Sequence, residues 1–289
     1  MANGILVIDK PADWTSHDVV AKLRGILHEK RIGHAGTLHP MATGVLPVFV
    51  GRATRAVEFA ADREKEYIAG LRLGTVTDTQ DITGSILSTV PVTVTREDVE
   101  QVLSRFRGES QQVPPMYSAI KKNGKKLYEL ARRGEEVERQ PRPITLYELE
   151  LLEQVSDAEY LLRVLCSKGT YVRTLCHDIG QALGCGGTMF SLRRTKAAGF
   201  DLSQAVTLEQ VAAMPEPAAR LLPVDAYFSG YPVLSLQDPM AEKKVRNGNS
   251  LALSGEDGTY RVYGPEGAFL ALSRLVNGRL TTIKSFFEV

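Results

Sequence analysis

The run RIGHAGTLHPMATGVLP, from Arg31 to Pro47, combines three glycines and two prolines with two histidines and a final apolar stretch. Residues 33–40 contain two of the glycines and one proline, so we predict a loop with special backbone angles rather than a helix or a strand. Loops on a rigid scaffold often carry reactive groups, which makes His34 and His39 candidates for a functional site. A tight surface turn is the alternative interpretation.

The flanking sequence predicts a strand, a helix and a second strand around this loop. Residues 5–8 are apolar and short, which is typical of a buried strand. Thr15 or Ser16 can cap a helix whose apolar residues recur at helical spacing and which should end near Lys30. Residues 45–50 are again apolar, so the loop is expected to connect this helix to a strand.

The middle of the chain alternates strand and helix patterns. Residues 67–73 alternate, which places Tyr67, Leu71 and Leu73 on one face of a strand. Thr95 and Asp98 form a capping-box pattern that opens a helix. A helix is expected at 126–133, after an Asn123-Gly124 turn, and another at 170–183. Two strands are expected between these helices, at 144–152 and 160–166. Because strands and helices are interspersed, we predict an α+β fold with a mostly antiparallel sheet.

A boundary is expected near residues 229–232, which read Ser-Gly-Tyr-Pro. Beyond it the chain has short strand patterns and Gly-Asn turns. We therefore expect two domains, a large one at 1–229 and a small β-rich one at 230–289.

Composition excludes several classes of protein. The chain has 289 residues, 43% of them hydrophobic, with a net charge of +1, which is ordinary for a globular protein. It has no apolar run of the roughly 20 residues that span a bilayer and no secretory signal pattern at its start, so we expect a cytoplasmic protein without membrane contact. Its three cysteines are not paired at disulfide or zinc spacing, and we expect reduced, buried thiols and no metal.

Basic residues are clustered although the net charge is small. One cluster is Lys121, Lys122, Lys125 and Lys126, and a second is Arg193, Arg194 and Lys196. Such clusters indicate contact with nucleic-acid phosphates, or they are merely solvated faces. The clusters alone leave both readings open.

The segment from Arg31 to Pro47 resembles the signature loop of the TruB family of pseudouridine synthases. More stretches that resemble the family follow in the same order, from about residue 4 to residue 210. They include Asp9-Lys10-Pro11, Lys65-Glu66-Tyr67, Thr77-Asp78-Thr79, residues 113–119, Asn123–Tyr128, Cys166–Thr174 and Leu192-Arg193-Arg194. The tail resembles, more weakly, the small RNA-binding PUA module that this family often carries.

The resemblance implies a pseudouridine-synthase catalytic domain and a reaction without metal or cofactor. The family converts uridine 55 in the T loop of tRNA into pseudouridine. An ionised aspartate attacks the nucleoside, the glycosidic bond breaks, the base rotates, and C5 joins C1′. The uridine must leave its stack to reach the pocket. The partner implied is the T-arm stem-loop of tRNA, and we expect the protein to be a monomer.

The resemblance also assigns roles to individual residues. Tyr67 matches the tyrosine that stacks on the flipped uridine, and Arg173 matches the arginine that holds the catalytic carboxylate. Residues matched to substrate contacts are His34, which inserts against the RNA loop, Tyr171 and Leu192, which line the uridine pocket, and Lys10, near the active-site loop. Each has a structural alternative, as a packing residue or a surface residue.

His39 departs from the family pattern, because it stands where the family has its nucleophilic aspartate. An aspartate is anionic at neutral pH, whereas a histidine is neutral or cationic. The cationic form is further disfavoured beside Arg173, and the arginine is expected to lack its anionic partner. We therefore predict a folded, RNA-binding protein with severely reduced or no isomerase activity, either an engineered variant or a natural non-catalytic relative.

Two functions from different classes remain open at the level of sequence. One is a tRNA uridine isomerase, and the other is a tRNA-binding or tRNA-folding protein that performs no chemistry. A small-molecule enzyme with the same fold is a third reading, which the basic clusters disfavour.

Overall fold

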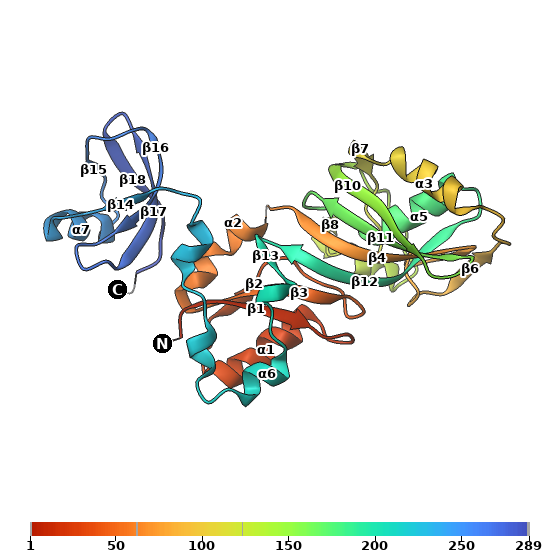
Figure 1. Ribbon diagram of the computed structural model, residues 1–289, viewed down its shortest axis with the longest axis horizontal. Helices are drawn as coiled ribbons and strands as arrows, with labels where there is room; N and C mark the ends of the chain where they lie inside the picture. The colour runs from red at the N-terminus through yellow and green to blue at the C-terminus, as the bar shows by residue number, and fades with distance from the viewer. Residues whose placement is uncertain (1, 62, 123, 288–289) are drawn as a thin grey trace.

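The computed structural model describes residues 2–61, 63–122 and 124–287. Asn123, half of the expected Asn-Gly turn, lies outside the described residues, as do residues 1, 62, 288 and 289. Figure 1 shows a long twisted sheet that carries helices at both ends, and a smaller lobe formed by the C-terminal residues.

A nine-stranded sheet forms the body of the protein and runs in the order β1-β3-β12-β4-β11-β10-β7. The β3–β12 pair is parallel and the other pairs are antiparallel, which confirms the mostly antiparallel sheet. The strands are β1 (Gly4–Lys10), β3 (Thr43–Val50), β12 (Gly187–Ala197), β4 (Lys65–Leu73), β11 (Glu159–Cys166), β10 (Arg142–Gln154) and β7 (Gly108–Gln112), with β2 (Ile32–His34) beside β3 and β13 (Phe200–Asp201) beside β12.

The two capping signals in the sequence are confirmed. Thr15 caps α1 (Ser16–Leu27) through a capping box with Asp18, and Thr95 caps α3 (Arg96–Ser104) in the same way. Helix α1 ends at Leu27, before the expected Lys30, because His28 adopts a left-handed conformation with φ of 50°. The other helices are α2 (Val57–Ala61), α4 (Leu127–Ala131), α5 (Val172–Ala182), α6 (Leu208–Ala213) and α7 (Pro239–Arg246), with single turns η1 (Gly51–Ala56), η2 (Leu202–Gln204), η3 (Pro217–Arg220) and η4 (Val224–Phe228).

The helices divide the sheet into two packed halves. Helices α3 and α5 bury their apolar faces, including Val99 and Ile179, against Leu71 and Leu162 of the central strands. Helices α1 and α6 pack on β1 and β3 at the other end of the sheet. The halves meet where β12 pairs with β3 only at Arg193 and Arg194. The loop that precedes β3 therefore lies at the junction of the two halves.

The expectation that residues 33–40 contain no regular structure was wrong for the first two of them. Ile32–His34 form β2, which pairs with residues 48–50 of β3. Strand β12 reaches β3 only at Thr43 and Gly44, so the remaining edge of β3 is open and β2 fills it. The irregular loop itself comprises residues 35–42.

The C-terminal residues build a five-stranded sheet in the order β14-β16-β17-β18-β15, with helix α7 and a separate core that includes Val245, Leu270 and Leu280. Its strands are β14 (Val233–Ser235), β15 (Leu251–Ala252), β16 (Gly258–Tyr263), β17 (Phe269–Val276) and β18 (Arg279–Ser285). This separate core supports our proposal of a domain boundary at 229/230. The PUA assignment stays a prediction.

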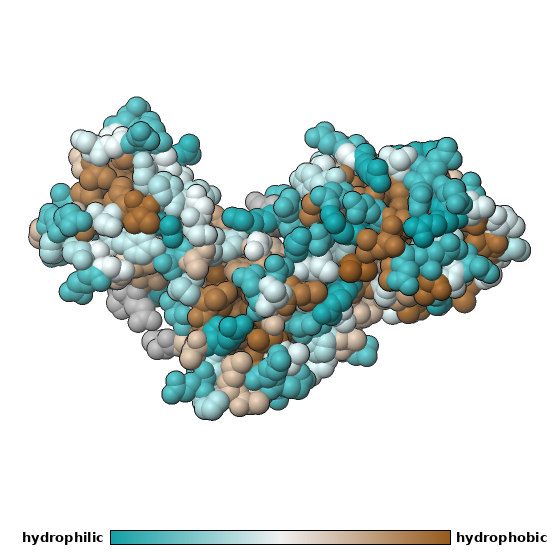
Figure 2. Space-filling model, viewed as in Figure 1, coloured by the Kyte–Doolittle hydropathy of each residue, from teal (hydrophilic) through white to brown (hydrophobic). Residues whose placement is uncertain are grey.

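An aromatic cluster connects the C-terminal lobe to the rest of the protein. The ring of Phe228 lies 6.3 Å from that of Phe269 and 5.4 Å from that of Phe286, measured between ring centroids. Figure 2 shows a broad hollow between the C-terminal lobe and the half of the main sheet that carries α3 and α5. Hydrophilic side chains cover much of both.

Two small hairpins project from the main sheet. One is formed by β5 (Thr75–Thr77) and β6 (Ile86–Thr89), and the other by β8 (Lys121–Lys122) and β9 (Lys125–Lys126). The second hairpin presents three exposed lysines, Lys121, Lys122 and Lys125. The three cysteines are free and buried, as expected. No helix among the described residues is long and apolar enough to cross a membrane.

Candidate active site

A fully buried lysine holds the loop at residues 35–42. The ammonium group of Lys10 donates hydrogen bonds to the carbonyl oxygens of Pro11 (2.7 Å), Trp14 (2.6 Å) and Pro40 (3.1 Å). Its burial lowers the pKa of Lys10 to about 8. Lys10 is thus an anchor of the loop, and it does not line the cavity beside it.

Two other buried polar side chains fix the same loop. The Ser16 hydroxyl accepts a hydrogen bond from the Leu38 amide at 2.9 Å. The Arg194 guanidinium donates to the carbonyl oxygens of Gly36 (2.9 Å) and Val45 (2.7 Å). Backbone carbonyls are obligatory acceptors, so these contacts satisfy loop groups that the fold has removed from water.

The structure does not support the reading of residues 193–196 as a basic cluster that contacts RNA. Arg194 is completely buried. Arg193 pairs with Asp9 at 2.8 Å, and Lys196 pairs with Glu66 at 3.2 Å. The strand directs one of these cations into the core and places carboxylates beside the other two, so little net positive charge faces solvent here.

The loop forms one wall of a cavity with a volume of about 220 Å³. Five of the seven residues selected from the sequence line it: His39, Tyr67, Tyr171, Arg173 and Leu192. They come from the loop, strand β4, the start of α5 and strand β12. The other lining residues are Thr37, Leu38, Ser118, Ala119, Thr170, Val172 and Met189.

Arg173 is the centre of a hydrogen-bond network in this cavity. One guanidinium nitrogen (Nη1) lies 3.0 Å from Asp81 Oδ2, and both side chains are nearly fully buried. The other (Nη2) lies 3.3 Å from His39 Nε2 and donates to the carbonyl oxygen of Tyr117. The expectation that Arg173 lacks an anionic partner was therefore wrong, because Asp81 supplies the negative charge.

Asp81 is the functional candidate that the sequence did not reveal. Thr79 Oγ1 and Thr83 Oγ1 donate to Asp81 Oδ1 at 2.9 Å and 2.5 Å, which leaves Oδ2 for Arg173. Burial raises the pKa of the Asp81 carboxyl, but these hydrogen bonds and the Arg173 charge outweigh it, so the net shift is downward. The only signal was its place two residues after the family motif at 77–79.

His39 lies at the exposed mouth of the cavity and is neutral at physiological pH. Partial burial of the ring and then the charge of Arg173 lower its pKa to about 4, with Asp81 opposing; the rest of the ring is exposed to water. Because a guanidinium can only donate, Nε2 must accept its hydrogen bond, and the ring proton resides on Nδ1. The nitrogen that faces the cavity residues therefore has its lone pair engaged by Arg173.

Tyr67 is buried in the cavity wall on β4. Burial raises the pKa of its phenol, while the nearby Arg194 charge opposes the shift. The phenol is thus protonated at neutral pH, and the expected stacking of a base on Tyr67 stays a prediction.

His34 lies apart from the cavity, on β2. Its ring packs edge-on against His17, with 5.5 Å between the centroids. Burial, followed by His17 and Arg194, lowers the pKa of His34 to about 4. Its Nδ1 is buried and has no hydrogen-bond partner among the described residues.

Two buried polar atoms in the cavity are also without partners in the described part of the chain, Ser118 Oγ and Arg173 Nε. An unmade hydrogen bond at a buried group is costly, so these two atoms add local strain to the cavity wall. Across residues 2–61, 63–122 and 124–287 no group of His, Cys, Asp or Glu side chains is arranged to hold a metal ion.

Comparison with known proteins identifies the family. Residues 24–172 match the model of the TruB family pseudouridylate synthase N-terminal domain, and residues 173–229 match the tRNA pseudouridylate synthase B C-terminal domain. The tRNA pseudouridine synthase B of Syntrophomonas wolfei is 46% identical over 97% of this chain and 96% of its own length. That of Azoarcus is 44% identical over 97% and 93%.

Solved structures agree with the sequence relatives. An H/ACA RNP bound to a substrate RNA containing 2′-deoxyuridine contains a chain that superposes with a TM-score of 0.73 at 25% identity, covering 99% of this chain and 86% of that one. A Cbf5-Nop10-Gar1 complex gives the same TM-score at 26% identity, covering 99% and 85%. With the two family models together spanning residues 24–229, the chain belongs to the TruB family of pseudouridylate synthases.

Proposed function

We propose that this protein binds tRNA at uridine 55 of the T loop through the scaffold of a pseudouridine synthase, and that His39 severely reduces or abolishes the isomerisation. The relatives named tRNA pseudouridine synthase B support the substrate class. The observation that carries the proposal is the contact of His39 Nε2 with Arg173, 3.3 Å apart in the candidate cavity.

The cavity suits a single flipped uracil. Tyr67 offers a stacking surface, and Tyr171 and Leu192 complete the walls. In the same proposal His34 contacts the RNA loop outside the cavity, and Lys10 positions the loop from within the protein.

The reaction needs an anion where His39 stands. During isomerisation the bond between N1 and C1′ breaks, the base turns, and a bond forms between C5 and C1′. The proton of C5 leaves to solvent and N1 takes up a proton from solvent, so the product is an isomer of the substrate. A carboxylate at position 39 could attack the nucleoside and be held ionised by Arg173. Neutral His39 carries no negative charge, and its cavity-facing lone pair already accepts from Arg173.

A direct test uses a T-arm stem-loop RNA labelled with tritium at C5 of the target uridine. This chain should bind the RNA but release almost no tritium, even at excess protein. An RNA with cytidine in place of the target uridine, labelled at C5, controls for nonspecific release. Weak and salt-insensitive binding would contradict the proposal, since phosphate contacts make RNA affinity fall with salt.

The second candidate function is tRNA folding without chemistry, and His39 is the observation that favours it. A tRNA unfolded by heating should recover its aminoacylation capacity faster with this protein present. We further propose a cytoplasmic location and a monomeric state. Gel filtration tests the monomeric state.

A further inference from the structure

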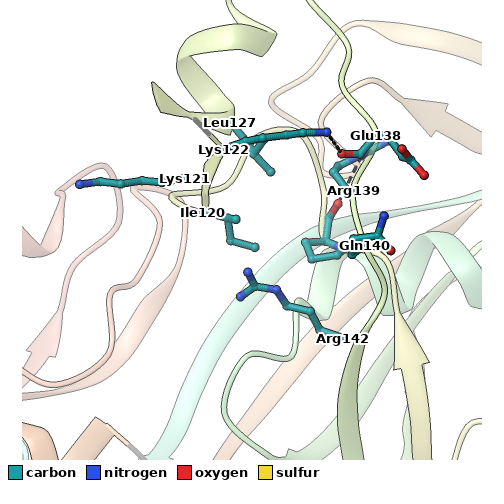
Figure 3. Close-up of a pocket in the computed structure, with 9 residues that line it drawn as sticks. Ile120, Lys121, Lys122, Leu127, Glu138, Arg139, Gln140 and Arg142 are labelled. Atoms are coloured by element: carbon teal, nitrogen blue, oxygen red, sulfur yellow. Dashed lines mark hydrogen bonds between the residues drawn. The ribbon is translucent and has the colours of Figure 1, made fainter. Parts of the chain in front are cut away.

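A second cavity, of about 270 Å³, lies beside the lysine hairpin. Strand β8, the start of α4 and the chain entering β10 form it, and Figure 3 shows Ile120, Lys122, Arg139 and Arg142 around it. None of these residues belongs to the candidate active site.

The lining of the second cavity is cationic, with an apolar wall. Figure 3 shows the guanidinium of Arg142 directed toward Ile120, whereas the side chain of Lys121 is directed away from both. The one acidic lining residue, Glu138, contributes its carbonyl oxygen, which accepts from Lys122 Nζ at 2.6 Å. Pro114, Ile120 and Leu127 supply apolar surface.

Arg139 is held in the wall of this cavity by its own hydrogen bonds. Its two terminal nitrogens contact the Pro114 carbonyl oxygen (3.3 Å) and Glu136 (3.0 Å). Its Nε is buried and has no hydrogen-bond partner in the described part of the chain. The exposed guanidinium of Arg142 beside this apolar wall matches a ligand that has both an anionic group and a flat apolar body, which is the chemistry of a nucleotide.

One short segment forms a wall of both cavities. Ser118 and Ala119 line the candidate active site, whereas Ile120 and Lys121 line the second cavity. The preceding residue, Tyr117, receives a hydrogen bond from Arg173. Two ligands on either side of this segment would therefore be close neighbours, as two nucleotides of one RNA strand are.

We propose that the second cavity binds an unpaired nucleotide of the same RNA strand that presents its uridine to the candidate active site. Arg142 holds its phosphate, and Ile120 contacts its base. The inference rests on the proposed function, since it takes the RNA to be the ligand of both cavities. A free mononucleotide has the same chemistry, and the experiment separates the two sources.

The test compares Arg142→Ala with Arg133→Ala in the full chain. Arg133 is exposed, lies just after α4 and is absent from the cavity lining, so it matches the charge change. Affinity for the T-arm stem-loop RNA is measured by fluorescence anisotropy between 50 and 200 mM salt. Arg142→Ala should weaken binding about tenfold and reduce the slope of log affinity against log salt by roughly 0.7. Arg133→Ala should change affinity less than about twofold.

A third variant, Ile120→Ser, tests the base contact. It should weaken binding by roughly fivefold, because it removes the apolar surface that the base would cover. It should leave the salt slope unchanged, because it removes no charge. Circular dichroism before each titration verifies that every variant is folded.

The outcomes discriminate between the proposals. Equal affinities of the Arg142 and Arg133 variants for RNA would overturn the second site alone. The second site would also be overturned if uridine monophosphate bound saturably and its binding depended on Arg142, while the affinity for RNA did not depend on Arg142. Failure of the unchanged chain to bind RNA at all would overturn the proposed function, and this inference with it.

Discussion

Arg173 forms its ion pair with Asp81, 92 residues earlier in the chain, through an Nη1–Oδ2 contact of 3.0 Å. The same guanidinium also contacts His39. The arginine is therefore charge-balanced and positioned without any carboxylate in the loop. A scaffold of this kind can remain folded and hold its cavity open while position 39 carries a residue that is unsuited to the reaction.

Removing the Asp81 charge should destabilise the fold. Asp81→Asn keeps the side-chain shape but leaves Arg173 as an uncompensated buried cation, and breaking a buried pair costs about 3 kcal/mol or more. Urea unfolding at neutral pH measures the loss. The control is Glu159→Gln, which breaks the more exposed pair with Arg72 and should cost at most about 1 kcal/mol. Similar losses for both variants would show that the Arg173–Asp81 pair contributes little.

Stability should fall as the pH drops below neutral, in part through His39. Its pKa is about 4 in the folded protein, against 6.5 for an unperturbed histidine. Between these values the unfolded chain binds a proton that the folded protein does not, so the free energy of unfolding decreases as pH falls from about 6.5 to about 4. His39→Gln removes this contribution. Urea unfolding at pH 7.5 and 4.5 should show a smaller decrease for the variant, and equal decreases would contradict the low pKa.

Lys10 should be essential for the active-site loop although it does not line the cavity. Lys10→Met retains the apolar stem but leaves three carbonyl oxygens without their donor, which should cost about 3 kcal/mol. Lys22→Met is the control, because Lys22 is exposed on α1. Limited proteolysis should cut the Lys10 variant near residues 37–41 sooner than the control. Identical digestion patterns would refute the anchoring role.

Two glycines should respond to alanine in opposite directions. Gly44 has a φ of +102°, and a Cβ there would lie 2.2 Å from the Arg194 carbonyl oxygen. Gly44→Ala should therefore separate β3 from β12 and lower the free energy of unfolding by about 3 kcal/mol. Gly25 lies inside α1 with open space around it, so Gly25→Ala should stabilise by about 0.5–1 kcal/mol. Thermal unfolding of both variants measures the contrast. A Gly44→Ala protein as stable as the unchanged chain would show that β3 and β12 need no close approach there.

Local signals in the sequence predicted the helix starts and much of the site. Thr15 and Thr95 cap helices because their side chains act on amides three residues away, which a sequence displays directly. The cavity residues His39, Tyr67 and Arg173 were found through family motifs.

Long-range partners were not predictable in this way. The pairing of Asp81 with Arg173 depends on tertiary structure across 92 residues. The burial of Arg194 was missed because a run of basic residues resembles a surface patch, whereas the strand directs this side chain into the core. Strand β2 exists only because β12 leaves part of the edge of β3 open, which no local pattern encodes.

The central claim is that His39 alone separates this chain from an active pseudouridine synthase. The most direct measurement is tritium release from the T-arm stem-loop RNA, labelled at C5 of the target uridine, by this chain and by His39→Asp side by side at excess protein. We predict equal RNA binding within a few-fold, rapid release by the aspartate variant and almost none by this chain. Comparable release rates for the two proteins would contradict the account, because another group, or His39 itself, would then supply the nucleophile.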